Sequence, residues 1–167
     1  MIEEKCKDLL DPYNGIKLIA HQTNTIGRMG AGLARIIRDN HLTNAEYQKY
    51  VALCGKQVTK RDLLGHVQLL TAKDGRLIAN CFAETVPTGR KRDTDYAAFE
   101  ACMVQLKAIA LSENILNIGI PGLMGCGLAG GNWLEILKIL HRVFDDCPVT
   151  LTICYLRQQD FEKYRGL

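Results

Sequence analysis

Apolar residues along the chain form short continuous runs separated by stretches with a different spacing. Continuous apolar runs bounded by turn signals are typical of strands buried in a sheet. Such runs cover residues 16–20, 66–70, 77–82, 115–120 and 149–155. The turn Lys73-Asp74-Gly75 joins the second run to the third, and Pro121 ends the fourth. The pattern therefore predicts a series of buried strands along the whole chain.

Between these runs, apolar residues recur every three or four positions, which is the spacing of one helix face. This spacing predicts helices over residues 33–37, 43–54, 95–111, 132–144 and 160–164. Two of the helix starts carry the residues of a capping box, Thr43 with Glu46 and Asn132 with Glu135.

Strands that alternate with helices are typical of an α/β protein with helices on both faces of the sheet. We therefore expect a three-layer α/β/α sandwich with a mixed, mostly parallel central sheet. A length of 167 residues suits one domain over 1–167, and the chain contains no repeat or linker-like segment. With 47% hydrophobic and 23% charged residues, the chain has the composition of a globular protein.

Charge and cysteine usage exclude several classes of protein. The net charge of +3 is too small to indicate direct nucleic-acid binding. No apolar run approaches the ~20 residues of a membrane-spanning helix, and Met1–Lys5 lacks the apolar core of a signal peptide. The seven cysteines form no C-x-x-C pair, and the histidines lack metal-ligand spacing. We therefore expect a cytoplasmic protein without disulfides, metal or cofactor.

Two glycine-rich segments follow predicted strands, at 21–34 and at 120–133. Glycines at the carboxyl end of a strand let the backbone approach a ligand closely, and open α/β sheets bind ligands at this edge. Two such segments suit a diphosphate held from both sides. The alternative is that these glycines only form tight turns. Residues 125–130 also match G-x-G-x-x-G, but a dinucleotide fingerprint should open the first βαβ unit, and here only one strand follows it.

The two glycine segments resemble those of the macrodomains, a family of ADP-ribose-binding α/β/α modules. The likeness is to the branch with H-x-x-N followed by M-G-x-G in the first segment and P-x-x-G-C-G-L in the second, and it extends from Asp8 to Tyr155. The resemblance implies that the partner is ADP-ribose or an ADP-ribosylated target.

The resemblance also implies a role for individual positions. Asp8 matches the aspartate that accepts a hydrogen bond from the adenine amino group, although Lys7 replaces the usual glycine before it. Asn24 matches the asparagine near the distal ribose, and Tyr155 or Phe161 would flank the adenine. The remaining expected ligand contacts are His21, Met29, Gly30, Ala31, Gly32, Leu33, Gly125, Cys126, Gly127, Leu128 and Ala129.

The family that the sequence resembles includes lysine-dependent hydrolases, and catalysis by this chain would differ from theirs. Those enzymes carry a lysine after the strand that corresponds to 77–82, where this chain has Glu84. Some add an aspartate in the second loop, where this chain has Ala129-Gly130-Gly131. Asn24 and Glu84 are the candidate catalytic residues, with Glu84 as a general base that activates water. The alternative is a glutamate that anchors a surface loop.

Three functions remain open from the sequence. The first is recognition of free or target-linked ADP-ribose, and the second is removal of ADP-ribose from a protein or nucleic-acid target. The third is a nicotinamide-dependent oxidoreductase, which the short chain after Gly130 disfavours. Residues 86–95, which include Arg90-Lys91-Arg92, are interpreted as a solvated loop that could act as a lid. Cys126 is either a packed thiol or one with a lowered pKa at a helix start.

Overall fold

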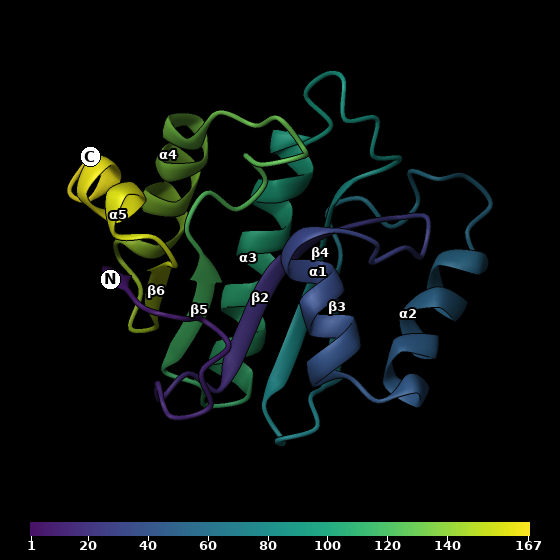
Figure 1. Cartoon of the computed structure of the whole chain (residues 1–167), viewed down its shortest axis with the longest axis horizontal. Helices are drawn as coiled ribbons and strands as arrows, with labels where there is room; N and C mark the ends of the chain where they lie inside the picture. The colour runs from purple at the N-terminus through teal and green to yellow at the C-terminus, as the bar shows by residue number, and fades with distance from the viewer.

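A computed structural model describes all residues, 1–167, as a six-stranded sheet with helices on both faces (Figure 1). The strand order is β1-β6-β5-β2-β4-β3. Every neighbouring pair is parallel except β3 and β4, which are antiparallel. The prediction of a mixed, mostly parallel sheet in an α/β sandwich is confirmed. The strands are β1 (Ile2–Cys6), β2 (Leu18–Asn24), β3 (Val67–Thr71), β4 (Leu77–Glu84), β5 (Asn117–Pro121) and β6 (Thr150–Tyr155).

The sheet divides the hydrophobic core into two clusters, one on each of its faces. One cluster joins α3 and α4 to the sheet, and the other joins the first helices to the opposite face. Along β2, Leu18 and Ala20 pack into the first cluster and Ile19 into the second, as the alternation of a strand requires. The helices are α1 (Gly32–Ile36), the π-helix η1 (Ile37–His41), α2 (Asn44–Gly55), α3 (Tyr96–Ser112), α4 (Trp133–Phe144) and α5 (Gln158–Tyr164). None of them is both long and apolar enough to cross a bilayer.

Side-chain caps explain where the three long helices begin. The Thr43 hydroxyl accepts a hydrogen bond from the Glu46 N–H at 3.2 Å, as the capping pair predicts. Asp95 accepts from Ala98 N–H at 3.0 Å, and Asn132 accepts from Leu134 N–H at 2.9 Å. Each bond satisfies a donor that the first turn of a helix leaves free. The predicted starts of α2, α3 and α4 are therefore confirmed.

Two strands differ from the sequence prediction. β1 was not predicted, because it lies at the sheet edge, is partly exposed and alternates only weakly between apolar and polar residues. β2 does not end at Ala20 but continues through four polar residues to Asn24. These residues are mostly buried, and their backbone pairs with β4. The polar end of β2 therefore lies inside the molecule.

The sheet opens between β2 and β5 toward its carboxyl edge. β2 pairs with β4 over its whole length, but it pairs with β5 only at Leu18 and Ile19. Beyond Ile19 these neighbouring strands separate, with β2 continuing to Asn24 and β5 to Pro121. Because the parallel strands end at the same edge, the opening faces the loops that follow β2, β4 and β5.

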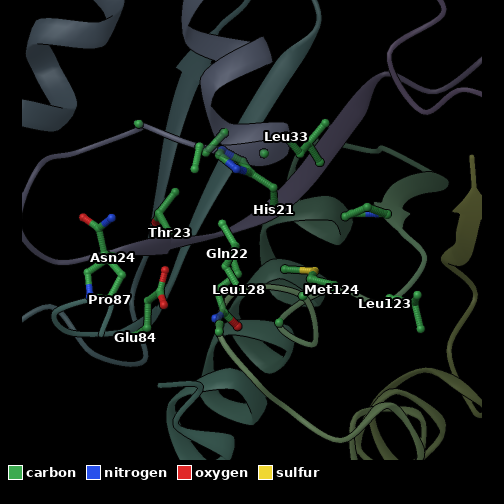
Figure 2. Close-up of a pocket in the computed structure, with 18 of the residues that line it drawn as sticks. His21, Gln22, Thr23, Asn24, Leu33, Glu84, Pro87, Leu123, Met124 and Leu128 are labelled. Carbon is green, nitrogen blue, oxygen red and sulfur yellow. The ribbon is translucent and has the colours of Figure 1, made fainter. Parts of the chain in front are cut away.

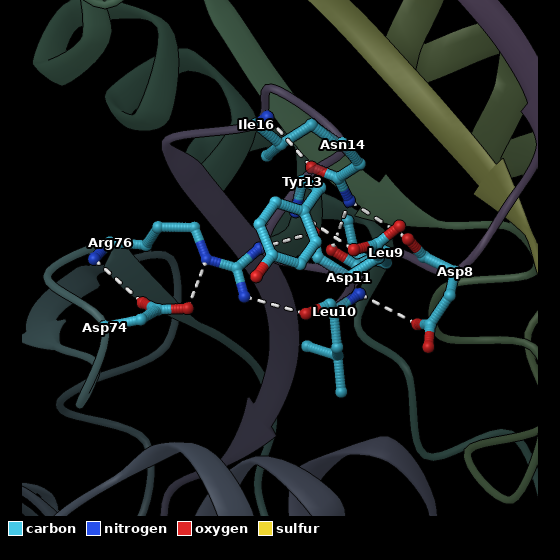
Figure 3. Close-up of polar contacts among 9 residues, drawn as sticks. All are labelled: Asp8, Leu9, Leu10, Asp11, Tyr13, Asn14, Ile16, Asp74 and Arg76. Carbon is cyan, nitrogen blue, oxygen red and sulfur yellow. Dashed lines mark hydrogen bonds and ion pairs between the residues drawn. The ribbon is translucent and has the colours of Figure 1, made fainter.

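The loop after β1 is held rigidly by polar contacts (Figure 3). The buried guanidinium of Arg76 donates to Leu10 O at 2.7 Å and to Asp11 O at 3.2 Å, and it also pairs with Asp74 at 2.8 Å. The Asn14 amide group donates to Asp8 O at 3.0 Å. Asp8 accepts a 2.8 Å bond from Leu10 N–H through one carboxylate oxygen, which leaves its other oxygen without a partner in the protein.

Candidate ligand-binding site

A cavity of about 530 Å³ lies at the carboxyl edge of the sheet, where β2 and β5 separate (Figure 2). Its walls are the polar end of β2, the two glycine segments and the ends of β4 and β5. The lining residues are 21–24, 28, 30–34, 84, 87, 121–125 and 127–129. The two glycine segments, which are far apart in sequence, thus face one shared space.

The first glycine segment is organised by Asn24. Its side-chain oxygen accepts from Arg28 N–H at 3.3 Å, from Ile26 N–H at 3.2 Å and from the Tyr50 hydroxyl at 2.8 Å. Its amide nitrogen donates to Arg28 O at 2.7 Å. Asn24 lines the cavity, but its oxygen is fully used in shaping the loop, so only one N–H of its amide is left for a ligand.

The second glycine segment is a tight curl that needs glycine at particular positions. Gly125 has a φ of 75°, and its carbonyl accepts from Gly131 N–H at 2.9 Å and from the Thr94 hydroxyl at 2.6 Å. A Cβ on Gly131 would lie 2.5 Å from the Gly125 carbonyl oxygen. The Gln22 amide donates to Thr94 at 3.0 Å, which ties the curl to β2. At Gly127, by contrast, a Cβ would meet no atom within 4 Å.

Glu84 is the only carboxylic acid in the cavity wall, and Arg28 is its only arginine or lysine. Figure 2 shows the Glu84 carboxyl group directed into the cavity near Asn24 and Pro87. Burial, with a smaller contribution from the negative charge of Asp93, raises the pKa of Glu84 to about 7. A substantial fraction of this group is therefore protonated at neutral pH.

His21 is neutral and presents a hydrogen-bond acceptor. Its Nε2 lies 2.8 Å from Asn80 Oδ1, and the Asn80 amide nitrogen donates to Gln68 at 3.2 Å. This chain of bonds assigns the proton to Nε2 and leaves the buried Nδ1 as an unpartnered acceptor. Burial lowers the pKa of His21 to about 4. The His21 ring is therefore held by a side chain and not by a backbone group.

Three consecutive residues of β2 each retain a buried polar atom without a partner. They are Nδ1 of His21, Oε1 of Gln22 and the hydroxyl of Thr23, and all three residues line the cavity. An unpaired buried polar atom costs free energy, roughly 1–3 kcal/mol. A polar ligand that satisfies them would remove this cost. No group of three or more His, Cys, Asp or Glu side chains is arranged to hold a metal ion.

Most of the residues expected from the sequence lie together in this wall. The structure places the following in it: His21, Asn24, Gly30, Ala31, Gly32, Leu33, Glu84, Gly125, Gly127, Leu128 and Ala129. The expected ligand contacts did not include Gln22, Thr23, Arg28 and Ala34. They also omitted Pro87 after β4, Pro121 at the end of β5 and residues 122–124 after it. Their position beside the glycines was the signal that could have identified them. Residues 21–24, the polar end of β2, were instead interpreted as a loop.

Four expected ligand residues lie outside the wall. Met29 and Tyr155 are each 1% exposed and pack in the core, Met29 toward α2 and Tyr155 against Trp133. Cys126 packs against the larger core cluster, and burial raises the pKa of its thiol to about 12, the opposite of a helix-start activation. Asp8 is exposed on the loop after β1.

No protein-family model matches the sequence, and no curated protein matches it either. Solved structures do match. The macrodomain of Mycobacterium tuberculosis DarG is 22% identical with a TM-score of 0.73, covering 93% of this chain and 97% of that one. A macrodomain protein from Streptomyces coelicolor is 21% identical with a TM-score of 0.73, covering 93% and 98%.

A further match is the structure of Thermosipho africanus DarTG in complex with ADP-ribose. It is 20% identical with a TM-score of 0.65, and the match covers 86% of this chain and 39% of that one. At these identities the comparison establishes the fold. The chain therefore has the macrodomain fold, as the glycine segments led us to expect.

Proposed function

We propose that the chain binds ADP-ribose, either free or attached to a target, in the cavity between the glycine segments. The observation that carries the proposal is that both segments line one cavity at the carboxyl edge of the sheet. The structural similarity to a protein solved with ADP-ribose supports the same ligand.

The main chain of the two segments suits the diphosphate. The N–H groups of Gly30 and Ala31 on one wall, and those of Gly127, Leu128 and Ala129 on the other, donate no hydrogen bond within the protein. Main-chain donors in such concave turns bind phosphate oxygens well. Arg28 supplies the positive charge that a diphosphate requires.

The width of the sheet fits the length of the ligand. From β1 to β4 the sheet spans four strand spacings, about 19 Å, which is comparable to an extended ADP-ribose. We assign the adenine end to the side of Asp8, whose free carboxylate oxygen can accept a bond from the amino group. The terminal ribose then lies near Asn24 and Glu84, where the unpartnered atoms of His21 and Thr23 are available to hydroxyl groups.

Calorimetric titration with ADP-ribose, beside AMP and NAD, tests the proposal. We expect ADP-ribose to bind and AMP to bind much more weakly, because AMP lacks the second phosphate and the terminal ribose. Gly127→Leu should abolish binding without unfolding the chain, because a Cβ at this position meets no atom within 4 Å and the side chain extends from the cavity wall. Gly55→Leu is the matched control, since Gly55 also has open space around it but ends α2 away from the cavity.

Three results would contradict the proposal. One is the absence of heat with ADP-ribose, and another is unchanged ADP-ribose affinity in Gly127→Leu. The third is binding of NAD at least as strong as that of ADP-ribose, which would favour a dinucleotide-dependent enzyme instead.

A further inference from the structure

The two edge strands of the sheet, β3 and β1, differ in how their outer main-chain groups are satisfied. At β3, the N–H groups of Val67 and Thr71 face away from β4, and a side chain caps each of them. Gln105 of α3 accepts from Val67 N–H at 2.7 Å, and Glu46 of α2 accepts from Thr71 N–H at 2.9 Å. Such caps oppose the addition of another strand, so β3 is a protected edge.

The opposite edge strand, β1, carries no such caps. At one end of β1, Met1 O accepts from Leu151 N–H at 2.9 Å, and at the other end Lys7 N–H donates to Tyr155 O at 3.0 Å. The odd-numbered residues of β1 therefore bond to β6, and the even-numbered residues direct their N–H and C=O groups outward. These outward groups have no partner in the protein, and they belong to Ile2, Glu4 and Cys6. In Figure 1 the N-terminus lies at the margin of the molecule, beside β6.

The charges of β1 suit antiparallel pairing with an identical strand. In the register centred on Glu4, Glu3 of each copy lies opposite Lys5 of the other copy. The neighbouring registers that also join outward-facing residues are centred on Glu3 or on Lys5, and each of them places like charges opposite each other. Opposite charges stabilise a cross-strand pair, whereas like charges destabilise it. The sequence of β1 therefore selects one register.

The side chains of β1 are compatible with this pairing. Glu3 and Lys5 lie on the same face of the strand, 2.7 Å apart, and both reach solvent. The Glu4 carboxylate, which would lie opposite its own copy, is turned toward its own subunit. It accepts from the Tyr155 hydroxyl at 3.0 Å and from Gly166 N–H at 2.7 Å, and these donors stabilise its charge.

We infer that the chain forms a two-fold symmetric dimer in which β1 pairs antiparallel with β1 of a second copy, centred on Glu4. The two sheets then form one continuous sheet, and the outward groups of Ile2, Glu4 and Cys6 bond across the axis. The carboxyl edges of the two sheets point in opposite directions, so the inference does not depend on the ligand. One short strand buries less than the ~1,200 Å² of a stable interface, so the dimer is weak and depends on concentration.

Sedimentation velocity over a concentration series up to roughly 1 mM tests the inference. The wild-type chain should shift from monomer to dimer as its concentration rises. Glu3→Lys and Lys5→Glu should each raise the dissociation constant of the dimer by about tenfold or more, because each places like charges opposite each other at two positions. An equal mixture of the two variants should dimerise again, since every charged pair across the axis is then a glutamate with a lysine.

The matched control is Lys138→Glu, which makes the same change of charge at an exposed lysine of α4. It should dimerise like the wild-type chain. A second readout is amide hydrogen exchange, which should slow at Glu4 and Cys6 as concentration rises but change little at Lys5, whose N–H already bonds to β6.

Three results would overturn the inference. One is a wild-type chain that remains monomeric over the whole series. Another is a dimer that Glu3→Lys and Lys5→Glu leave unchanged, because it would form through a different surface. The third is a mixture of the two variants that stays monomeric, although circular dichroism shows both to be folded.

Discussion

Removing a single oxygen from Tyr155 separates a structural role from a ligand-binding one. Its hydroxyl accepts a hydrogen bond from Trp133 Nε1–H at 3.1 Å and donates one to Glu4 at 3.0 Å. Tyr155→Phe keeps the buried ring but leaves the Trp133 N–H without a partner, which costs roughly 1–3 kcal/mol. It also removes a bond to a carboxylate, worth about 1.5 kcal/mol where that group retains solvent. We therefore expect the free energy of unfolding to fall by about 2.5–4.5 kcal/mol.

Urea unfolding followed by tryptophan fluorescence measures this loss, and Trp133 is the only tryptophan in the chain. For a chain of this length each kcal/mol lowers the melting temperature by roughly 2–4 °C, so a thermal scan should show the same effect. Tyr13→Phe is the control, because Tyr13 is 93% exposed and its hydroxyl has no partner. Its free energy of unfolding should change by no more than about 0.5 kcal/mol.

A measurement of the affinity of Tyr155→Phe for ADP-ribose completes the test. Tyr155 lies outside the cavity wall, so Tyr155→Phe should bind ADP-ribose as tightly as the wild-type chain under native conditions. A change in stability below about 0.5 kcal/mol, or a tenfold loss of affinity without a loss of stability, would refute this assignment. The second result would indicate instead that Tyr155 contacts the adenine, as the family resemblance implies.

Two further predictions concern stability. The pKa of Glu84 is raised from 4.5 to about 7, so the folded chain retains this proton to a higher pH than the unfolded chain does. As pH rises from 4.5 through 7, the wild-type chain should therefore lose stability relative to Glu84→Gln. Urea unfolding midpoints of the two proteins across this pH range measure the difference. An increasing wild-type advantage across that range would contradict it. Arg76→Met should destabilise the chain by about 3 kcal/mol, because it removes the guanidinium donor to the Leu10 and Asp11 carbonyls and the ion pair with Asp74. The exposed Arg90→Met should change stability little.

Much of the fold could be predicted because local and tertiary signals agree. The capping pair at Thr43 and Glu46 marks the start of α2, and the apolar stripe from Trp133 to Phe144 in α4 is buried against the sheet as expected. β1 gave no such signal, since an edge strand with partly exposed residues needs no strong alternation. Its existence depends on the pairing with β6, which lies at the other end of the sequence.

The candidate site was predictable where backbone conformation demands a residue type. Glycine at 125 is needed for its positive φ, and Gly131 for its contact with the Gly125 carbonyl, so both are visible in sequence. Side-chain direction was not predictable in the same way. Whether Tyr155 faces a ligand or the core depends on α4 and α5, whose Trp133 and Phe161 pack against its ring.

The small side chains of the cavity wall have a consequence for evolution. Eight of the lining residues are glycine or alanine: Gly30, Ala31, Gly32, Ala34, Gly122, Gly125, Gly127 and Ala129. A wall made largely of main chain places few demands on the identity of neighbouring side chains, because every residue offers the same amide. Sequences can therefore drift far apart while the path of the backbone, and with it the shape offered to a ligand, is inherited. The chemical properties of the cavity can then change through substitution of single lining residues, such as Glu84.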